Sequence, residues 1–141
     1  MLSDYQFVLP WPVQWGDQDA FGHVNNTIYF RWFESARIEY MNRLGLDDLY
    51  EKERVGPILA SIKCDYRRQL HFPDTVRIGA RVSRLGRSSI GMEHRLVSES
   101  QNAVVAEGDS TLVVFDYKTQ QSCPIPEALR AAIEAFEQRK F

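Results

Sequence analysis

The most regular pattern of hydrophobic and polar positions is helical and begins at about residue 27. Large apolar side chains recur there at steps of three and four residues: Tyr29, Trp32, Phe33, Ala36, Tyr40 and Leu44. This spacing places them on one face of a helix, and so aromatic a face is expected to be deeply buried. Gly45 follows, a residue type favoured just beyond the end of a helix. The pattern therefore predicts a long central helix that ends near residue 44.

A second pattern, alternation of apolar and polar positions, predicts a strand at residues 76–85. Its apolar positions are Val76, Ile78, Ala80 and Val82, and they alternate with Arg77, Gly79, Arg81 and Ser83. One face of this strand is therefore expected in the core and the other in water. Residues 58–70, 88–99 and 103–117 are also strand-like. A turn at the Pro73-Asp74 pair joins the first of these stretches to the alternating strand.

The two ends of the chain complete the predicted outline. Residues 5–15 predict a first strand, which Pro10 and Pro12 restrict to a sheet edge or a bulge. A short polar segment separates the central helix from the second strand. Pro126 marks the start of a closing helix, whose apolar face carries Leu129, Ile133 and Phe136. The order of strand, long helix, four strands and short helix favours an α+β domain, with an antiparallel sheet of about five strands around the central helix.

Length and composition fit one ordinary domain. The chain has 141 residues, and no linker, repeat or low-complexity segment divides it, so we expect a single domain over residues 1–141. No apolar run approaches the ~18 residues of a membrane span. The N-terminus lacks the basic and apolar regions of a signal peptide, so a cytoplasmic protein without membrane association is expected. A net charge of -2 gives no overall attraction to nucleic acid.

Metal and disulfide chemistry are not indicated by the sequence. Cys64 and Cys123 are far apart and outside any CxxC spacing, so free thiols are expected. His71 and His94 have no partner at a ligand-like spacing. We therefore predict no metal site and no cofactor.

The stretch "GDQDAFGHVNN" ahead of the central helix holds more small polar groups than one helix cap requires. Asp17 and Asp19 are candidate bases or nucleophiles, and His23 can shuttle protons. Gly22 tolerates a positive φ and lets a substrate approach the backbone closely. The first N–H groups of the following helix lack intrahelical partners and can stabilise an oxyanion. This combination indicates an acyl-transfer or hydrolytic site.

A purely structural interpretation of the same residues exists. Asp19 or Asn26 would cap the helix, Gly22 would make a turn, and His23 would be a hydrogen-bonded structural residue. Further along the helix, Glu34 is expected to form an ion pair with Arg31 or Arg37.

The stretch "WGDQDAFGHVNNTIYFRWFESAR" resembles the signature of the 4-hydroxybenzoyl-CoA thioesterase-like proteins. The resemblance continues through "DYRRQLHFPDTVRIGARVSRLGRSSI" to "AEGDSTLVVFD" and so covers most of the chain. It implies a hotdog fold, in which an antiparallel sheet wraps a long helix. It also implies dimers or tetramers whose active sites are shared between subunits.

The resemblance assigns roles to residues of this loop. Asp19 matches the catalytic carboxylate, which acts as a base or a nucleophile. Asn26 matches the position whose backbone N–H contacts the thioester oxygen, and Gly22 and Asn25 are assigned to substrate binding. His23 resembles the histidine of the plant acyl-ACP thioesterases. This chain departs from their pattern at Phe21, so His23 is left open between handling protons and orienting the loop.

The nucleotide end of coenzyme A requires cationic or hydrogen-bonding groups. In relatives a basic residue at the turn "RLGRSS" contacts that end, and here Arg87, Ser88 and Ser89 occupy it. An ordinary solvated turn is an equally good interpretation of these residues. Arg67 and Arg68 form a second, weaker basic candidate.

The sequence as a whole predicts an acyl-CoA thioesterase that acts without a cofactor as a homodimer or tetramer. Two alternatives stay open: a thioesterase acting on acyl carrier protein, since "HVNN" resembles those enzymes, and a non-catalytic acyl-binding protein of the same fold. A hotdog dehydratase ranks last, because its Asp and His are arranged differently. The acyl group itself is not set by any of these residues.

Overall fold

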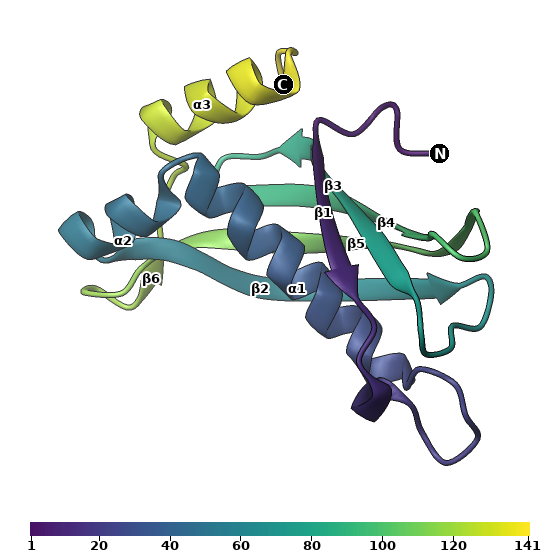
Figure 1. Cartoon of the computed structure of the whole chain (residues 1–141). Coiled ribbons are helices and arrows are strands. Elements are labelled where there is room, and N and C mark those ends of the chain that lie inside the picture. The colour runs from purple at the N-terminus through teal and green to yellow at the C-terminus, as the bar shows by residue number, and fades with distance from the viewer.

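An antiparallel sheet curls around one long helix (Figure 1). The computed structural model describes residues 1–141. The strands are β1 (Phe7–Pro12), β2 (Val55–Tyr66), β3 (Thr75–Leu85), β4 (Ser89–Ser98), β5 (Ala103–Asp116) and the short β6 (Gln121–Ser122). Their order is β1-β3-β4-β5-β2, and β6 pairs with β5. Because β2 pairs with β5 alone, one side of this strand is a free edge of the sheet.

The helix α1 (Asn26–Arg43) crosses the concave face of the sheet, as the aromatic pattern predicted (Figure 1). Its buried residues are Tyr29, Trp32, Phe33, Ala36, Arg37, Tyr40 and Met41. A short 3-10 turn (Trp15–Asp17) precedes α1, and α3 (Glu127–Glu137) closes the chain. The predicted α+β fold, with its central helix, sheet and C-terminal helix, is confirmed.

The segment that follows α1 was predicted as a polar connection, and this prediction is wrong. It forms the helix α2 (Leu46–Glu53), which lies over β2. Gly45 adopts a φ of 93°, which ends α1 and starts α2 in a new direction. Its apolar residues Leu46, Leu49 and Tyr50 have a helical spacing, but this repeat is only one turn long and only Leu46 is buried, so the signal in the sequence is weak.

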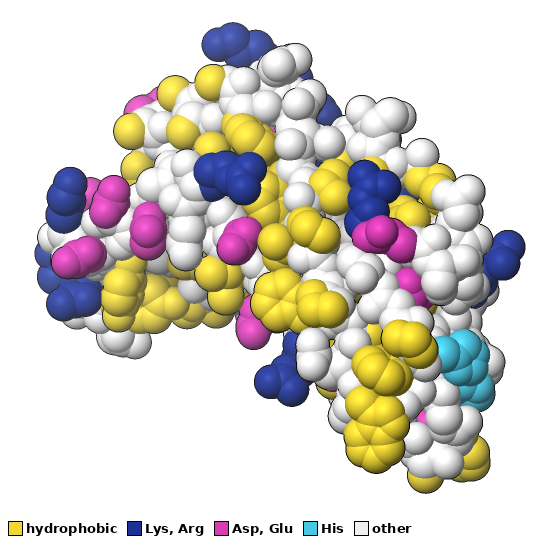
Figure 2. All heavy atoms as spheres, in the orientation of Figure 1, with side chains coloured by type: hydrophobic (Ala, Val, Ile, Leu, Met, Phe, Trp, Pro, Cys, Tyr) yellow, Lys and Arg dark blue, Asp and Glu magenta, His cyan; other side chains and the backbone are white.

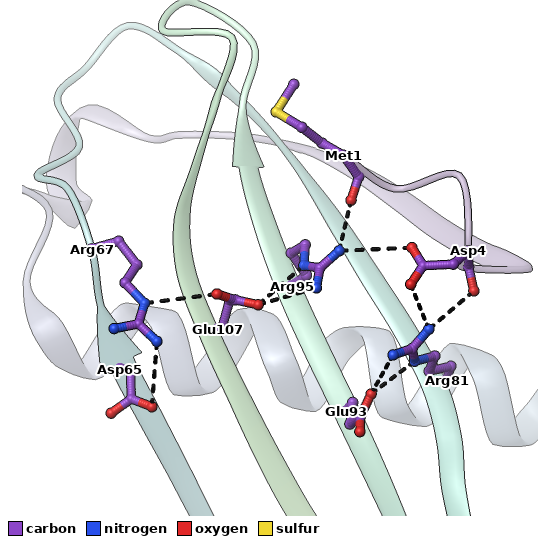
Figure 3. Close-up of polar contacts among 8 residues, drawn as sticks. All are labelled: Met1, Asp4, Asp65, Arg67, Arg81, Glu93, Arg95 and Glu107. Carbon is purple, nitrogen blue, oxygen red and sulfur yellow. Dashed lines mark hydrogen bonds and ion pairs between the residues drawn. The ribbon is translucent and has the colours of Figure 1, made fainter.

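The outer face of the sheet is also less exposed than the alternation in β3 predicted. Leu2 and Tyr5 lie against this face and bury Gly79, where an added Cβ would come within 2.8 Å of both side chains. Arg81 and Arg95 stand over the Tyr5 ring at 4.7 and 5.3 Å. Figure 3 shows the ion pairs that continue across the strands, made by Asp4, Arg81, Glu93, Arg95, Glu107, Arg67 and Asp65.

No helix of this structure combines the length and the apolar character that crossing a membrane requires.

Candidate active site

The polar stretch before α1 forms a tight loop at the N-terminal end of the helix. Gln18 and Val24 form an isolated antiparallel bridge, and Asp19 N–H donates to the His23 carbonyl at 2.7 Å. Gly22 closes the loop with a φ of 82° and donates its N–H to the Asp19 carbonyl at 3.1 Å. The positive φ expected of Gly22 is therefore present, and it allows the chain to reverse within a few residues.

This loop holds the Asp19 carboxylate by one of its oxygens. Oδ1 accepts hydrogen bonds from the N–H groups of Phe21 at 2.8 Å and His23 at 3.4 Å. Oδ2 accepts no hydrogen bond within the chain. Asp17 is held in a similar way, because its Oδ2 accepts from Gln14 N–H at 2.8 Å in the cap of the 3-10 turn and its Oδ1 accepts no hydrogen bond within the chain. Each aspartate thus has one oxygen without a partner, and the two differ in that Asp19 lines the pocket described below.

The start of α1 is capped by Asn25. Its Oδ1 accepts from the N–H and the hydroxyl of Thr27 at 2.9 and 2.7 Å. The structural interpretation that Asp19 or Asn26 caps the helix is therefore wrong. Asn26 N–H makes no hydrogen bond within the chain and lies in the first turn, at the positive end of the helix dipole. This N–H has the position and the freedom that an oxyanion donor needs.

Three of the residues predicted to be catalytic line one pocket of about 400 Å³, namely Asp19, His23 and Asn26. The end of β2 and the loop after it form the opposite wall with Tyr66, Arg67, Arg68 and Gln69. Gly22 and Asn25, the residues assigned to substrate binding, are not part of the lining. The pocket is thus lined by a residue with a partly unpaired carboxylate and by a residue with an unpaired backbone N–H, two groups that acyl transfer uses.

Tyr66 has a role at this pocket that the sequence reasoning missed. Its hydroxyl donates to the Asn26 carbonyl at 2.8 Å and ties β2 to the first turn of α1. Burial raises the pKa of Tyr66 to about 12, so the hydroxyl keeps its proton and remains a donor at neutral pH. Tyr29, expected in the core, is buried and packs edge-on against the Tyr66 ring, with centroids 4.8 Å apart.

His23 meets a second histidine that was assigned no role. The rings of His23 and His71 lie edge to face with centroids 5.0 Å apart, and His71 Nδ1 is 3.0 Å from the Gly22 carbonyl. Figure 2 shows histidine side chains together on the surface, at the end of the molecule that carries the loop before α1. No hydrogen bond joins the His23 ring to the Asp19 carboxylate. No periodicity or spacing in the chain signals this contact, because the loop and the segment after β2 meet only in the folded protein.

Arg87, Ser88 and Ser89 are not brought to the Asp19 pocket within one chain. Arg87 and Ser88 lie in the turn between β3 and β4, and Ser89 begins β4. This turn lies toward α3, while the Asp19 loop lies at the far end of the molecule (Figure 1). Arg87 and Ser88 also offer backbone carbonyls to Ile125 and Val114. The basic candidates nearest to Asp19 in the same chain are instead in the β2 wall. Of these, Arg68 lines the pocket, is exposed, and forms no ion pair.

No three His, Cys, Asp or Glu side chains are grouped as metal ligands. Cys64 and Cys123 are free thiols, as predicted.

The curled sheet around the buried helix, together with the similarity to named thioesterases, identifies a hotdog-fold thioester hydrolase, the enzyme class predicted from the sequence. Residues 13–133 match the thioesterase-like superfamily. The chain belongs to this family, and the predicted resemblance is confirmed.

Solved structures and curated proteins agree with this assignment. PA2801, a putative thioesterase from Pseudomonas aeruginosa, is 36% identical with a TM-score of 0.82, over 92% of this chain and 98% of that one. A Thermus thermophilus thioesterase complexed with coenzyme A and Zn is 33% identical with a TM-score of 0.87, over 99% of both chains. The long-chain acyl-CoA thioesterase FadM of Escherichia coli is 26% identical over 116 residues, 82% of this chain and 88% of FadM.

Proposed function

We propose that this protein hydrolyses an acyl-CoA thioester to the free acid and coenzyme A. The observation that carries the proposal is that Asp19 and Asn26 line one pocket, and that the Asp19 carboxylate keeps Oδ2 free while the Asn26 N–H has no partner in the chain. The similarity to FadM, and to a thioesterase that was crystallised with coenzyme A, supports the choice of substrate class.

In the proposed reaction the thioester carbonyl oxygen accepts a hydrogen bond from Asn26 N–H. As negative charge develops on that oxygen, the N–H and the positive end of the α1 dipole stabilise it. Tyr66 supports this donor indirectly, because its hydroxyl bonds to the carbonyl of the same residue and fixes the first turn. Tyr66 is therefore a positioning residue.

Asp19 supplies the attack by one of two routes. As a general base, it takes a proton from water while the water oxygen bonds to the acyl carbon. As a nucleophile, Oδ2 bonds to the acyl carbon and water then cleaves the resulting anhydride. In both routes the carbon–sulfur bond breaks, the coenzyme A sulfur takes up a proton, and water is the only substance consumed besides the thioester. His23 lies close enough to the pocket to pass that proton.

The nucleotide end of the substrate has two candidate sites in this proposal. Arg68 can bind phosphate from the wall of the same pocket, with Gln69 beside it. Arg87, Ser88 and Ser89 can reach the substrate only if they come from another subunit, since their turn lies at the far end of the chain that holds Asp19.

A homodimer is part of the proposal. The free edge of β2 is 12 residues long and carries exposed Ile58 and Leu59, which suits it to pairing with another strand. The other free edge belongs to β1, which is 6 residues long and contains Pro10 and Pro12. We therefore place the second copy at β2.

The direct test is a hydrolysis screen that detects free thiol over short, long, branched and aromatic acyl-CoAs. The proposal expects turnover on at least one of these esters. Turnover on acyl carrier protein alone would select the carrier-protein thioesterase instead. Binding of acyl-CoA without release of thiol would identify a non-catalytic acyl-binding protein.

A further inference from the structure

Arg37 carries a buried charge that forms no ion pair or hydrogen bond within its own chain. It lies on α1 and is only 6% exposed. The guanidinium makes no hydrogen bond and no ion pair, and Nη1 is completely buried without an acceptor. The expected ion pair of Glu34 with Arg31 or Arg37 is not formed, and Glu34 is exposed one turn before Arg37. A charge taken out of water needs a compensating partner, so an acceptor from outside the chain is indicated.

The charged and titratable groups near Arg37 inside the chain do not form the missing contact. Burial lowers the pKa of Arg37, and the Glu34 charge of the same chain opposes this shift without forming an ion pair. His94 on β4 is buried, stacks on Phe33 with centroids 4.8 Å apart, and lies 2.9 Å by Nε2 from the Ser110 hydroxyl. Burial, together with the positive charge of Arg37, lowers the pKa of His94 to about 3. The histidine is therefore neutral near pH 7 and contributes no negative charge.

Arg37 lines a pocket of about 430 Å³ between α1, α2 and the edge strand β2. The pocket is largely apolar, and its exposed rim includes Ile38 and Leu59, which are 52% and 41% exposed. Glu34 belongs to the same lining. Figure 2 shows hydrophobic side chains along the lower side of α2 and over the middle of α1, with acidic side chains among them. The free edge of β2 runs along this surface.

A second copy of this chain is an occupant whose symmetry and charge suit this surface. Antiparallel pairing of β2 with its own copy is generated by a two-fold axis perpendicular to the sheet, which keeps both α1 helices on the same face. The side of α1 that faces β2 then faces the same side of the partner's helix. In a two-fold interface, any contact between two positions occurs twice, with the roles exchanged. Glu34 and Arg37 have opposite charges and lie one turn apart, so they are complementary to themselves under this symmetry.

We propose that the partner subunit's Glu34 is the acceptor for Arg37, and that this pair forms twice across the dimer axis. The inference rests on the homodimer proposed above and is independent of the hydrolytic chemistry. Two such pairs, closed off by Ile38 and Leu59, fix the register in which two copies meet, because a shift of one helical turn leaves both guanidinium groups without a carboxylate.

The test is a charge exchange measured by sedimentation velocity over a range of concentrations. Glu34→Arg alone and Arg37→Glu alone place like charges opposite each other and are expected to weaken the dimer at least ~10-fold. The double variant E34R/R37E exchanges the charges and is expected to recover most of that loss. Failure of the double variant to dimerise better than the weaker single variant would overturn the proposal.

Milder variants keep the test decisive if a charge reversal prevents folding. Glu34 is exposed, so Glu34→Gln is expected to fold and to weaken the dimer several-fold, and Arg37→Met should do the same. Glu39→Gln, an exposed acid on α1 that is not part of the pocket, is the matched control and should leave the dimer unchanged. An unchanged dimer in both Glu34→Gln and Arg37→Met would overturn the proposal. In that case a raised KM for acyl groups with an acidic end would identify the substrate as the partner of Arg37.

Thiol release measured on the same samples separates the two proposals. A dimer that responds to the charge exchange but hydrolyses no acyl-CoA would refute the proposed activity and leave the Arg37 pairing in place. An enzyme that releases thiol but whose dimer is unaffected by the charge exchange would refute the Arg37 pairing and leave the proposed activity in place.

Discussion

Asp19 is held by its own loop rather than by the helix that follows it. The polar residues before α1 have separate roles. Asn25 caps α1, Asp17 caps the 3-10 turn, and Asp19 is bonded through Oδ1 and keeps Oδ2 free. Asp17 also keeps one carboxylate oxygen without a partner, but Asp19 is the aspartate that lines the pocket with Asn26. The functional interpretation of Asp19 therefore depends on its place in the pocket.

Recognition of the nucleotide end can be assigned to one of two arginines by substitution. Arg68→Ala and Arg87→Ala each remove one exposed cation. The variant at the true phosphate contact should raise KM for a CoA ester about tenfold, while KM for the truncated pantetheine thioester stays the same. Steady-state kinetics on the two substrates make the comparison. Equal effects on both substrates, or none, would remove that arginine from the site.

The buried His94 makes the stability of the fold depend on pH. Its pKa is about 3 in the folded chain and near 6.5 in the unfolded one, so below pH 6.5 the unfolded state binds a proton that the native state does not. The free energy of unfolding should therefore fall as pH drops from 6.5 toward 3, by up to about 1.4 kcal/mol per pH unit from this group. Urea denaturation at several pH values measures the slope. His94→Gln should reduce it, and an unchanged slope would contradict this account.

At the scale of elements, the sequence predicted the helices and strands whose apolar residues repeat at a regular, short spacing. The aromatic repeat of α1 and the alternation in β3 arise from burial against one layer, so their periods are visible in the chain. The helix α2 was missed because its apolar repeat, Leu46, Leu49 and Tyr50, is only one turn long. The residues of the pocket also fall into those that a local sequence pattern could predict and those that it could not. Asp19 and Asn26 are close in sequence, whereas Tyr66 reaches the pocket only because β2 crosses beside α1.

The N-terminal segment is an element that no periodicity reveals, because it has one contact surface and no repeat. Tyr5 is 7% exposed, stacked under Arg81 and Arg95, and seated over Gly79. Tyr5→Ala should lower the free energy of unfolding by about 2 kcal/mol, through lost burial and lost cation–π contact.

Urea denaturation measures this loss, with Tyr5→Phe as the control. That variant keeps the ring, and the Tyr5 hydroxyl makes no hydrogen bond in the chain, so stability should be nearly unchanged. Equal losses in both variants would show that the hydroxyl, rather than the ring, holds the segment.

At the scale of the whole molecule, the free edge of β2 and the apolar surface beside it imply assembly. We expect a dimer of twice the 16.4 kDa chain at micromolar concentration. Sedimentation velocity distinguishes this state from a monomer or a tetramer. A stable 16.4 kDa species would contradict the dimer, and a tetramer would require a second interface elsewhere on the surface.

The central claim is that Asp19 performs the chemistry, and the turnover number of Asp19→Asn on the best acyl-CoA found tests it most directly. The amide keeps an oxygen to accept from Phe21 and His23 N–H, so the loop and the fold should survive. We predict that kcat falls at least ~100-fold with KM little changed, while Asp17→Asn, the matched control, retains substantial activity. Near-normal turnover by Asp19→Asn would contradict the account and reduce Asp19 to a residue that shapes the loop.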